Sequence, residues 1–160
     1  MQGGPLLHNV AGKAVGFEEA LQPEFEEYAA QTVENAAVLG ERLQEHGFEL
    51  VSGGTDTHLV LADLRGSHPD VTGKEAEQAL EDVGIVLNAN TVPNETRSPF
   101  VGSGIRAGTP ALTTRGFDED DMREVADLIA KVVDSVDDED VKAEAAERVQ
   151  QLCDANPLYE

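Results

Sequence analysis

The most informative stretch of the chain is rich in glycine and proline: Ser98-Pro99-Phe100-Val101-Gly102-Ser103-Gly104-Ile105-Arg106-Ala107-Gly108-Thr109-Pro110. Its second half is typical of a strand whose glycines let the backbone come close to a ligand. Arg106 lies two residues from a glycine on either side, and its planar guanidinium suits bidentate binding of a carboxylate or phosphate. Pairing with one of the chain's many acids is the competing interpretation, and at this point both stay open.

Helices are predicted on both sides of this stretch. Thr72 and Glu75 have the spacing of a capping box and predict a helix that runs to Gly84. The first apolar stripe, which includes Val10 and Phe17, predicts a helix with one buried face. Helices that follow from apolar residues at three- and four-residue spacing are expected over 6–21, 24–46, 118–136 and about 139–154.

Short aliphatic runs predict the strands. They are expected over 48–51, 58–64 and 85–90, with a further strand inside the stretch quoted above. The first two can pair as a hairpin across the turn residues 52–57. The order of elements predicts an α/β fold with a mixed or antiparallel sheet and helices packed on one face. We expect residues 1–23 to be a loop and linking helix, and residues 24–160 to be the α/β domain.

The charge balance is strongly acidic. The 160 residues hold 32 Asp and Glu against 11 Lys and Arg, a formal net charge of -21. This composition predicts adaptation to high salt, and an ordinary acidic cytosolic domain is the competing interpretation. A basic patch that could displace counterions is missing, so neither nucleic acid nor an anionic membrane surface is expected as a partner.

Other classes of chemistry have little support in the sequence. Cys153 is the only cysteine, so a disulfide within the chain and a cysteine-based zinc site are excluded. The four histidines show no ligand spacing, and no metal site is expected. No nucleophile motif, P-loop or dinucleotide pattern is present. The first residues do not have the pattern of a signal peptide and no long apolar run follows, so a cytoplasmic location is expected.

Several motifs in the same order resemble the C-terminal part of serine hydroxymethyltransferase, a fold-type I pyridoxal-phosphate enzyme. The resemblance extends over essentially the whole chain. Its motifs are Gln2-Gly3-Gly4-Pro5 with His8, Ala11-Gly12-Lys13-Ala14, Ser52-Gly53-Gly54-Thr55-Asp56 with His58-Leu59, Thr72-Gly73-Lys74-Glu75-Ala76, Asn90 with Val92-Pro93-Asn94, Ser98-Pro99-Phe100, and Ser103 to Pro110.

The resemblance implies an activity and a set of site residues. The family converts serine and tetrahydrofolate, or a related pterin, to glycine and the methylene carrier, as a homodimer or homotetramer. By this resemblance Arg106 binds the substrate carboxylate, and Asn90 with Ser98, Pro99 and Phe100 lies against the folate. Gly3 and Gly4 match a loop that reaches the phosphate of pyridoxal phosphate in the neighbouring subunit, whereas structural roles are expected for Lys74 and His58.

The sequence also departs from the family. The large domain, with the lysine that forms the Schiff base, lies upstream of the motif matched by residues 2–5. None of Lys13, Lys74, Lys131 and Lys142 has the sequence context of that lysine, so no catalytic residue is expected here and the isolated chain is expected to be inactive. Met1 is interpreted either as an internal methionine of a longer protein or as the start of a split or truncated product. A non-catalytic remnant or split subunit is therefore the alternative function.

Overall fold

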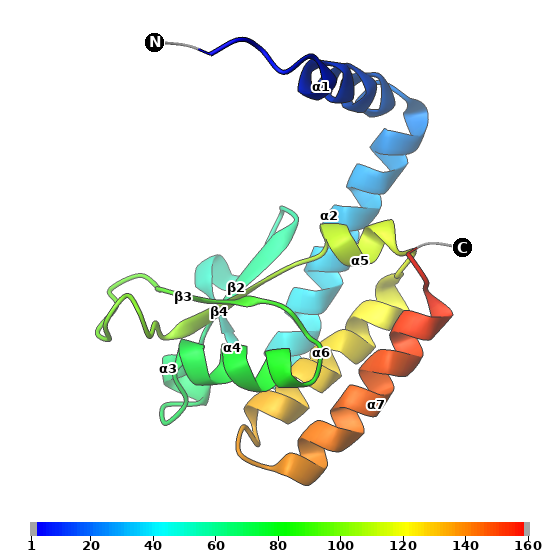
Figure 1. Ribbon diagram of the computed structural model, residues 1–160. Coiled ribbons are helices and arrows are strands. Elements are labelled where there is room, and N and C mark those ends of the chain that lie inside the picture. The colour runs from blue at the N-terminus through cyan, green and yellow to red at the C-terminus, as the bar shows by residue number, and fades with distance from the viewer. Residues whose placement is uncertain (1–2, 159–160) are drawn as a thin grey trace.

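Helices pack against one small sheet in the computed structural model, which describes residues 3–158 (Figure 1). A single turn of 3-10 helix, Val51–Gly53, follows the first strand. The elements in chain order are α1 (Leu7–Ala20), α2 (Pro23–Glu45), β1 (Glu49–Leu50), β2 (Leu59–Asp63), α3 (Leu64–Ser67), α4 (Gly73–Asp82), β3 (Asn88–Asn90), β4 (Gly104–Gly108), α5 (Pro110–Thr114), α6 (Glu119–Val133) and α7 (Glu139–Ala155).

The sheet has the strand order β1-β2-β4-β3, and every pair is antiparallel. The predicted hairpin is confirmed as β1 paired with β2, and the predicted α/β fold with an antiparallel sheet is confirmed as well. Strand β4 lies between β2 and β3, so it is hydrogen-bonded along both edges. In this register Arg106 lies opposite Leu61 on one side and Asn88 on the other.

The two faces of the sheet differ. Val60, Ala62 and Ile105 point into the core and are almost fully buried, and α2, α4 and α6 pack on this side. Because neighbouring side chains of a strand point to opposite faces, Arg106 lies on the other face, where it is exposed. The core therefore fixes the backbone of β4 and leaves the arginine outside it.

The predicted helix caps are present. The Thr72 hydroxyl accepts from the Glu75 N–H, and the Glu75 carboxylate accepts from the Thr72 N–H. Gly47, at the predicted end of the second helix, has a φ of +86°, the left-handed conformation of a C-terminal cap. Most of the predicted stripe of the 118–136 helix is buried, but Val136 lies beyond the end of α6.

The prediction of a buried face on the first helix is wrong for this chain. No residue of α1 is buried, and Leu7 and Phe17 are 75% and 69% exposed. Figure 1 shows α1 extending from the start of α2, away from the sheet. Helical periodicity indicates which face of a helix is apolar, but it does not indicate what covers that face. Within residues 3–158, no surface does so.

Three smaller differences concern short elements. The strand expected over 85–90 is reduced to Asn88–Asn90, because the chain leaves α4 through Gly84, with a φ of +86°, and Ile85 still donates to the Leu80 carbonyl as part of the helix end. Helices α3 and α5 were not predicted.

No helix of the described residues is long and apolar enough to cross a membrane.

Candidate functional site

Arg106 lies on the open face of the sheet, in the centre of β4. Its Nε donates to the Asn88 Oδ1 at 3.1 Å, which holds the base of the guanidinium. The same region is a shallow depression of about 420 Å³ that is lined also by His58, Leu59 and Asn88. Arg106 is exposed, and its two terminal nitrogens have no hydrogen-bond partner among the described residues.

The alternative interpretation, that Arg106 is paired with an acid, finds no support among residues 3–158. None of the ion pairs of this part of the chain includes Arg106. The remaining arginines all bond carboxylates or backbone carbonyls: Arg42 to Asp127, Arg65 to Asp63, Arg97 to Val71, Arg115 to Cys153, Arg123 to Asp120 and Arg148 to Glu124. In a chain this acidic, an arginine without a carboxylate partner is available for an external anion.

The loop between β3 and β4 carries the other predicted site residues. Asn90 pairs with Gly104 and lies two residues from Asn88, so it is on the same face of the sheet as Arg106. Ser98, Pro99 and Phe100 are exposed, and Phe100 is 91% accessible. The Ser98 carbonyl accepts from the N–H groups of Val101 and Gly102, which closes a tight turn at this point.

Glu95 organises the interior of this loop. One carboxylate oxygen, Oε1, accepts from the N–H groups of Thr96 and Arg97 at 2.9 Å each and from the Ser103 hydroxyl at 2.6 Å. The other, Oε2, accepts from the N–H groups of Ser103 at 3.0 Å and Val92 at 3.3 Å. Partial burial raises the pKa of Glu95, but these hydrogen bonds outweigh it and lower the pKa to about 2.

Two arginines brace the same loop from outside. Arg65, the second residue of α3, donates to the carbonyls of Pro93 and Asn94. Arg97, within the loop, donates to the carbonyls of Val71 and Pro69. Each segment thus supplies an arginine to the backbone of the other, and these two side chains make four hydrogen bonds between the loop and residues 63–71.

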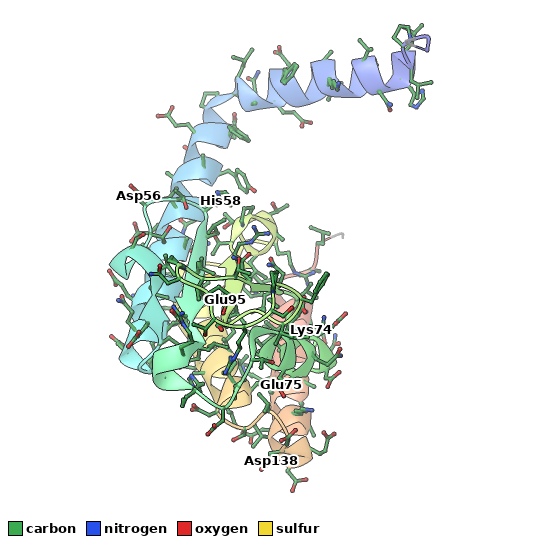
Figure 2. The ribbon with its side chains drawn as sticks, turned by 90° about the vertical axis from the view of Figure 1, so that its left-hand side faces the viewer. Asp56, His58, Lys74, Glu75, Glu95 and Asp138 are labelled. Carbon is green, nitrogen blue, oxygen red and sulfur yellow. The ribbon has the colours of Figure 1, made fainter. Side chains whose placement is uncertain are left out.

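Glycines allow the backbones around the loop to come together. Gly102 has a φ of +65°, and a Cβ there would lie 2.7 Å from the Asn90 carbonyl oxygen. A Cβ on Gly73, the first residue of α4, would lie 2.4 Å from the Gly104 carbonyl oxygen. Figure 2 shows Glu95 within the loop, with Lys74 and Glu75 on α4 to one side of it and Asp56 and His58 to the other.

Two predicted residues lie elsewhere. Gly3 and Gly4 precede α1 at its far end, and no side chain would be obstructed there. The structure therefore does not bring them together with Arg106 in the same chain (Figure 1). Lys74 pairs with Glu77 on the surface of α4, whereas His58 lines the depression beside Arg106.

Three of the four lysines are held in ion pairs that do not fit a Schiff-base role for pyridoxal phosphate. Lys74 and Lys142 pair with glutamates, Glu77 and Glu139, and their pKa values are raised by these hydrogen bonds. A lysine must lose its proton to form an imine, and a raised pKa opposes this. Lys131 also pairs with a glutamate. Residues 3–158 contain no cluster of histidine, cysteine and carboxylate side chains suited to a metal ion.

Sequence reasoning missed three residues of the site: Asn88, Glu95 and Arg65. Asn88 could have been found from the alternation of the strand over 85–90, which places it beside Arg106 once the pairing is known. Glu95 bonds mostly backbone N–H groups, and such partners leave no pattern in the sequence. Arg65 bonds carbonyls 28 and 29 residues away, a contact that only the folded chain defines.

Known proteins match this chain over nearly its whole length. The family model described as serine hydroxymethyltransferase matches residues 1–129. A serine hydroxymethyltransferase of Halobacterium salinarum is 73% identical over 159 residues, which are 99% of this chain and 38% of that protein. Those of Haloarcula marismortui and Haloquadratum walsbyi are 73% and 61% identical, each again over 99% of this chain and 38% of the relative.

The chain thus spans 38% of the length of these curated relatives. Their names agree with the resemblance carried by the motifs around Arg106, Asn90 and Thr72. On the match to the family model and on these identities, the chain belongs to the serine hydroxymethyltransferase family, of which it represents the C-terminal part.

Proposed function

We propose that the chain forms the amino-acid and folate side of a serine hydroxymethyltransferase, which converts serine and tetrahydrofolate, or a related pterin, to glycine and the methylene carrier. The observation that carries the proposal is Arg106, exposed on the open face and held by Asn88 without a carboxylate partner in the described chain. In this role Arg106 binds the carboxylate of serine or glycine through the outer edge of its guanidinium.

The folate side of the proposal rests on the loop between β3 and β4. Asn90 shares the face of Arg106, and Ser98, Pro99 and Phe100 are exposed between these two residues in the chain. An exposed aromatic ring beside polar groups suits a flat heteroaromatic ligand, because the ring stacks and the polar groups fix its orientation. We assign these four residues to folate binding.

In this proposal the residues that hold pyridoxal phosphate lie mainly in parts of the enzyme outside this chain. Pyridoxal phosphate would supply the electron sink for the bond cleavage at serine, and the ion-paired Lys74, Lys131 and Lys142 do not fit its attachment. We assign Gly3 and Gly4, at the far end of α1, to a loop that reaches the cofactor phosphate in a neighbouring subunit of a homodimer or homotetramer. We also propose a cytoplasmic enzyme adapted to high salt, in keeping with the net charge of -21 and with relatives from halophilic archaea.

Arg106→Lys in the complete enzyme tests the assignment. A lysine keeps the charge but loses the planar fork, so the KM for serine is expected to rise by about tenfold or more, the size of one lost charged hydrogen bond. Arg123→Lys is the matched control, because Arg123 is an exposed arginine that pairs with Asp120 on α6. An unchanged KM for serine in Arg106→Lys would show that the carboxylate binds elsewhere.

A non-catalytic role for the chain by itself is favoured by one observation: three of its four lysines are held in surface ion pairs. In this second function the chain is a split subunit that acts only with a partner carrying the large domain. The purified chain mixed with pyridoxal phosphate, serine and tetrahydrofolate is then expected to form no glycine. Glycine formation by the chain alone would contradict this function.

A further inference from the structure

The carboxylate of Glu95 lies among hydrogen-bond donors only. Its two oxygens accept four backbone N–H groups and one hydroxyl, with three donors on Oε1 and two on Oε2. A glutamine side chain has the same shape, but one of its two positions is an amide NH₂ that would face N–H donors. The surroundings therefore specify a carboxylate, although no arginine or lysine pairs with it among the described residues.

The donors come from two different parts of the chain. Val92, Thr96 and Arg97 lie in the loop after β3, whereas Ser103 directly precedes β4. Ser103 is fully buried, and its carbonyl accepts from the N–H of Leu64 at 2.9 Å, so it is fixed to the core. Glu95 thus connects the loop to a residue that the core holds in place.

The residues proposed to bind the carboxylate and the folate both lie close in sequence to the residues that Glu95 connects. Arg106 follows Ser103 by three residues on the same strand, and Asn90 precedes Val92 by two residues. Ser98 to Phe100 lie between the loop donors and Ser103, in the part of the loop that Glu95 closes. Glu95 therefore joins the segment that carries the exposed turn to the strand that carries Arg106.

We propose that Glu95 is a positioning residue, which closes the 91–103 loop onto the start of β4 and so sets the placement of Ser98–Phe100 relative to Arg106. The proposal rests on the proposed function, since it names the residue that joins the folate side to the carboxylate side. Because the donors are neutral, the connection is also expected to persist in molar salt, where ion pairs between exposed side chains are screened over about 3 Å.

The test uses Glu95→Gln in the complete enzyme, with Glu41→Gln as the matched control. Glu41 is an exposed glutamate of α2, so this variant makes the same charge change far from the loop. Backbone amide exchange at Ser103 and Arg97 reports the loop directly. In Glu95→Gln these amides are expected to exchange about tenfold faster or more, as for the loss of one charged hydrogen bond.

The kinetic readout separates positioning from a general loss of structure. The KM for tetrahydrofolate is expected to rise by about tenfold in Glu95→Gln, with kcat within about threefold of the parent, because binding geometry and not chemistry is altered. Glu95→Asp, which keeps the carboxylate on a shorter side chain, is expected to recover part of the KM. If Glu95→Gln does not fold, Ser103→Ala removes the hydroxyl donor alone and is expected to raise the same KM by about threefold.

Two results would overturn the proposal. One is unchanged amide exchange at Ser103 and Arg97 in Glu95→Gln. The other is faster exchange with an unchanged KM for tetrahydrofolate. A parent enzyme without tetrahydrofolate-dependent serine cleavage would instead contradict the proposed function, and the exchange measurement would still show whether Glu95 closes the loop.

Discussion

Gly102→Ala is the sharpest test of how closely the loop packs on β3. Gly102 has a φ of +65°, a conformation that costs a residue with a Cβ about 1–2 kcal/mol. The new methyl group would also lie 2.7 Å from the carbonyl oxygen and 3.1 Å from the carbonyl carbon of Asn90. Because that neighbour is backbone within a strand, relieving the contact is expected to cost a further 1–3 kcal/mol or so.

Two other glycines separate these contributions. Gly47 has a φ of +86° and no atom within 4 Å of its Cβ position, so Gly47→Ala is expected to lose only the conformational part, about 1 kcal/mol. The Cβ of Gly108→Ala would meet its nearest atom, the His58 carbonyl oxygen, at 3.6 Å, an ordinary contact. This variant is expected to change the free energy of unfolding by less than about 0.5 kcal/mol.

The assay is urea unfolding of the parent and the three variants in one buffer with molar KCl, followed by circular dichroism. Gly102→Ala is expected to be less stable than the parent by about 2–5 kcal/mol, the sum of the two contributions, with an unchanged dependence on urea. If Gly102→Ala and Gly47→Ala lose the same free energy, the loop does not press on Asn90 and the description of its packing is wrong.

Two predictions concern charge. The melting temperature of the chain is expected to rise as KCl increases from millimolar to molar. The chain has 32 acidic residues and only 11 basic ones, and the excess negative charges repel one another until salt screens them. A melting temperature independent of KCl would refute salt adaptation. The folded-state pKa of Glu95, about 2, lies below its ordinary value of 4.5, so its ionised form stabilises the fold above pH 4.5 and this contribution is lost as the pH falls toward 2. Glu95→Gln is therefore expected to lower the free energy of unfolding at pH 7 by about 1–3 kcal/mol, a range that allows for solvent screening of a partly exposed group. This difference from the parent is expected to shrink in acid. A difference that is the same at pH 7 and pH 3 would count against the hydrogen bonds of Glu95.

The elements that could be predicted from the sequence are those with a local cause. The capping box of Thr72 and Glu75 and the cap at Gly47 involve residues at most a few positions apart, and both are present. The stripe of α6 was predicted because its core-facing residues recur at helical spacing. The hairpin of β1 and β2 followed from two aliphatic runs that flank a cluster of turn residues.

Other features depend on contacts across the chain, and the sequence does not contain them in readable form. The stripe of α1 gave a correct helix but a wrong burial, because burial requires a second surface. The missed helix α5 begins at Pro110 directly after a strand, where proline at the first helical position was the available signal. The availability of Arg106 was an open question in the sequence, since only the fold shows which of the 32 acids lie near it.

The bonds from Arg65 and Arg97 end on main-chain carbonyls, and this affects how the enzyme can diverge. A carbonyl group is present whichever side chain the residue carries, so Pro69, Val71 and Asn94 can be replaced without deleting the acceptor, provided that the chain keeps its path. Exposed residues of these segments can therefore be exchanged while the loop retains its shape. The composition of the surface and the geometry of the loop can accordingly evolve along separate lines.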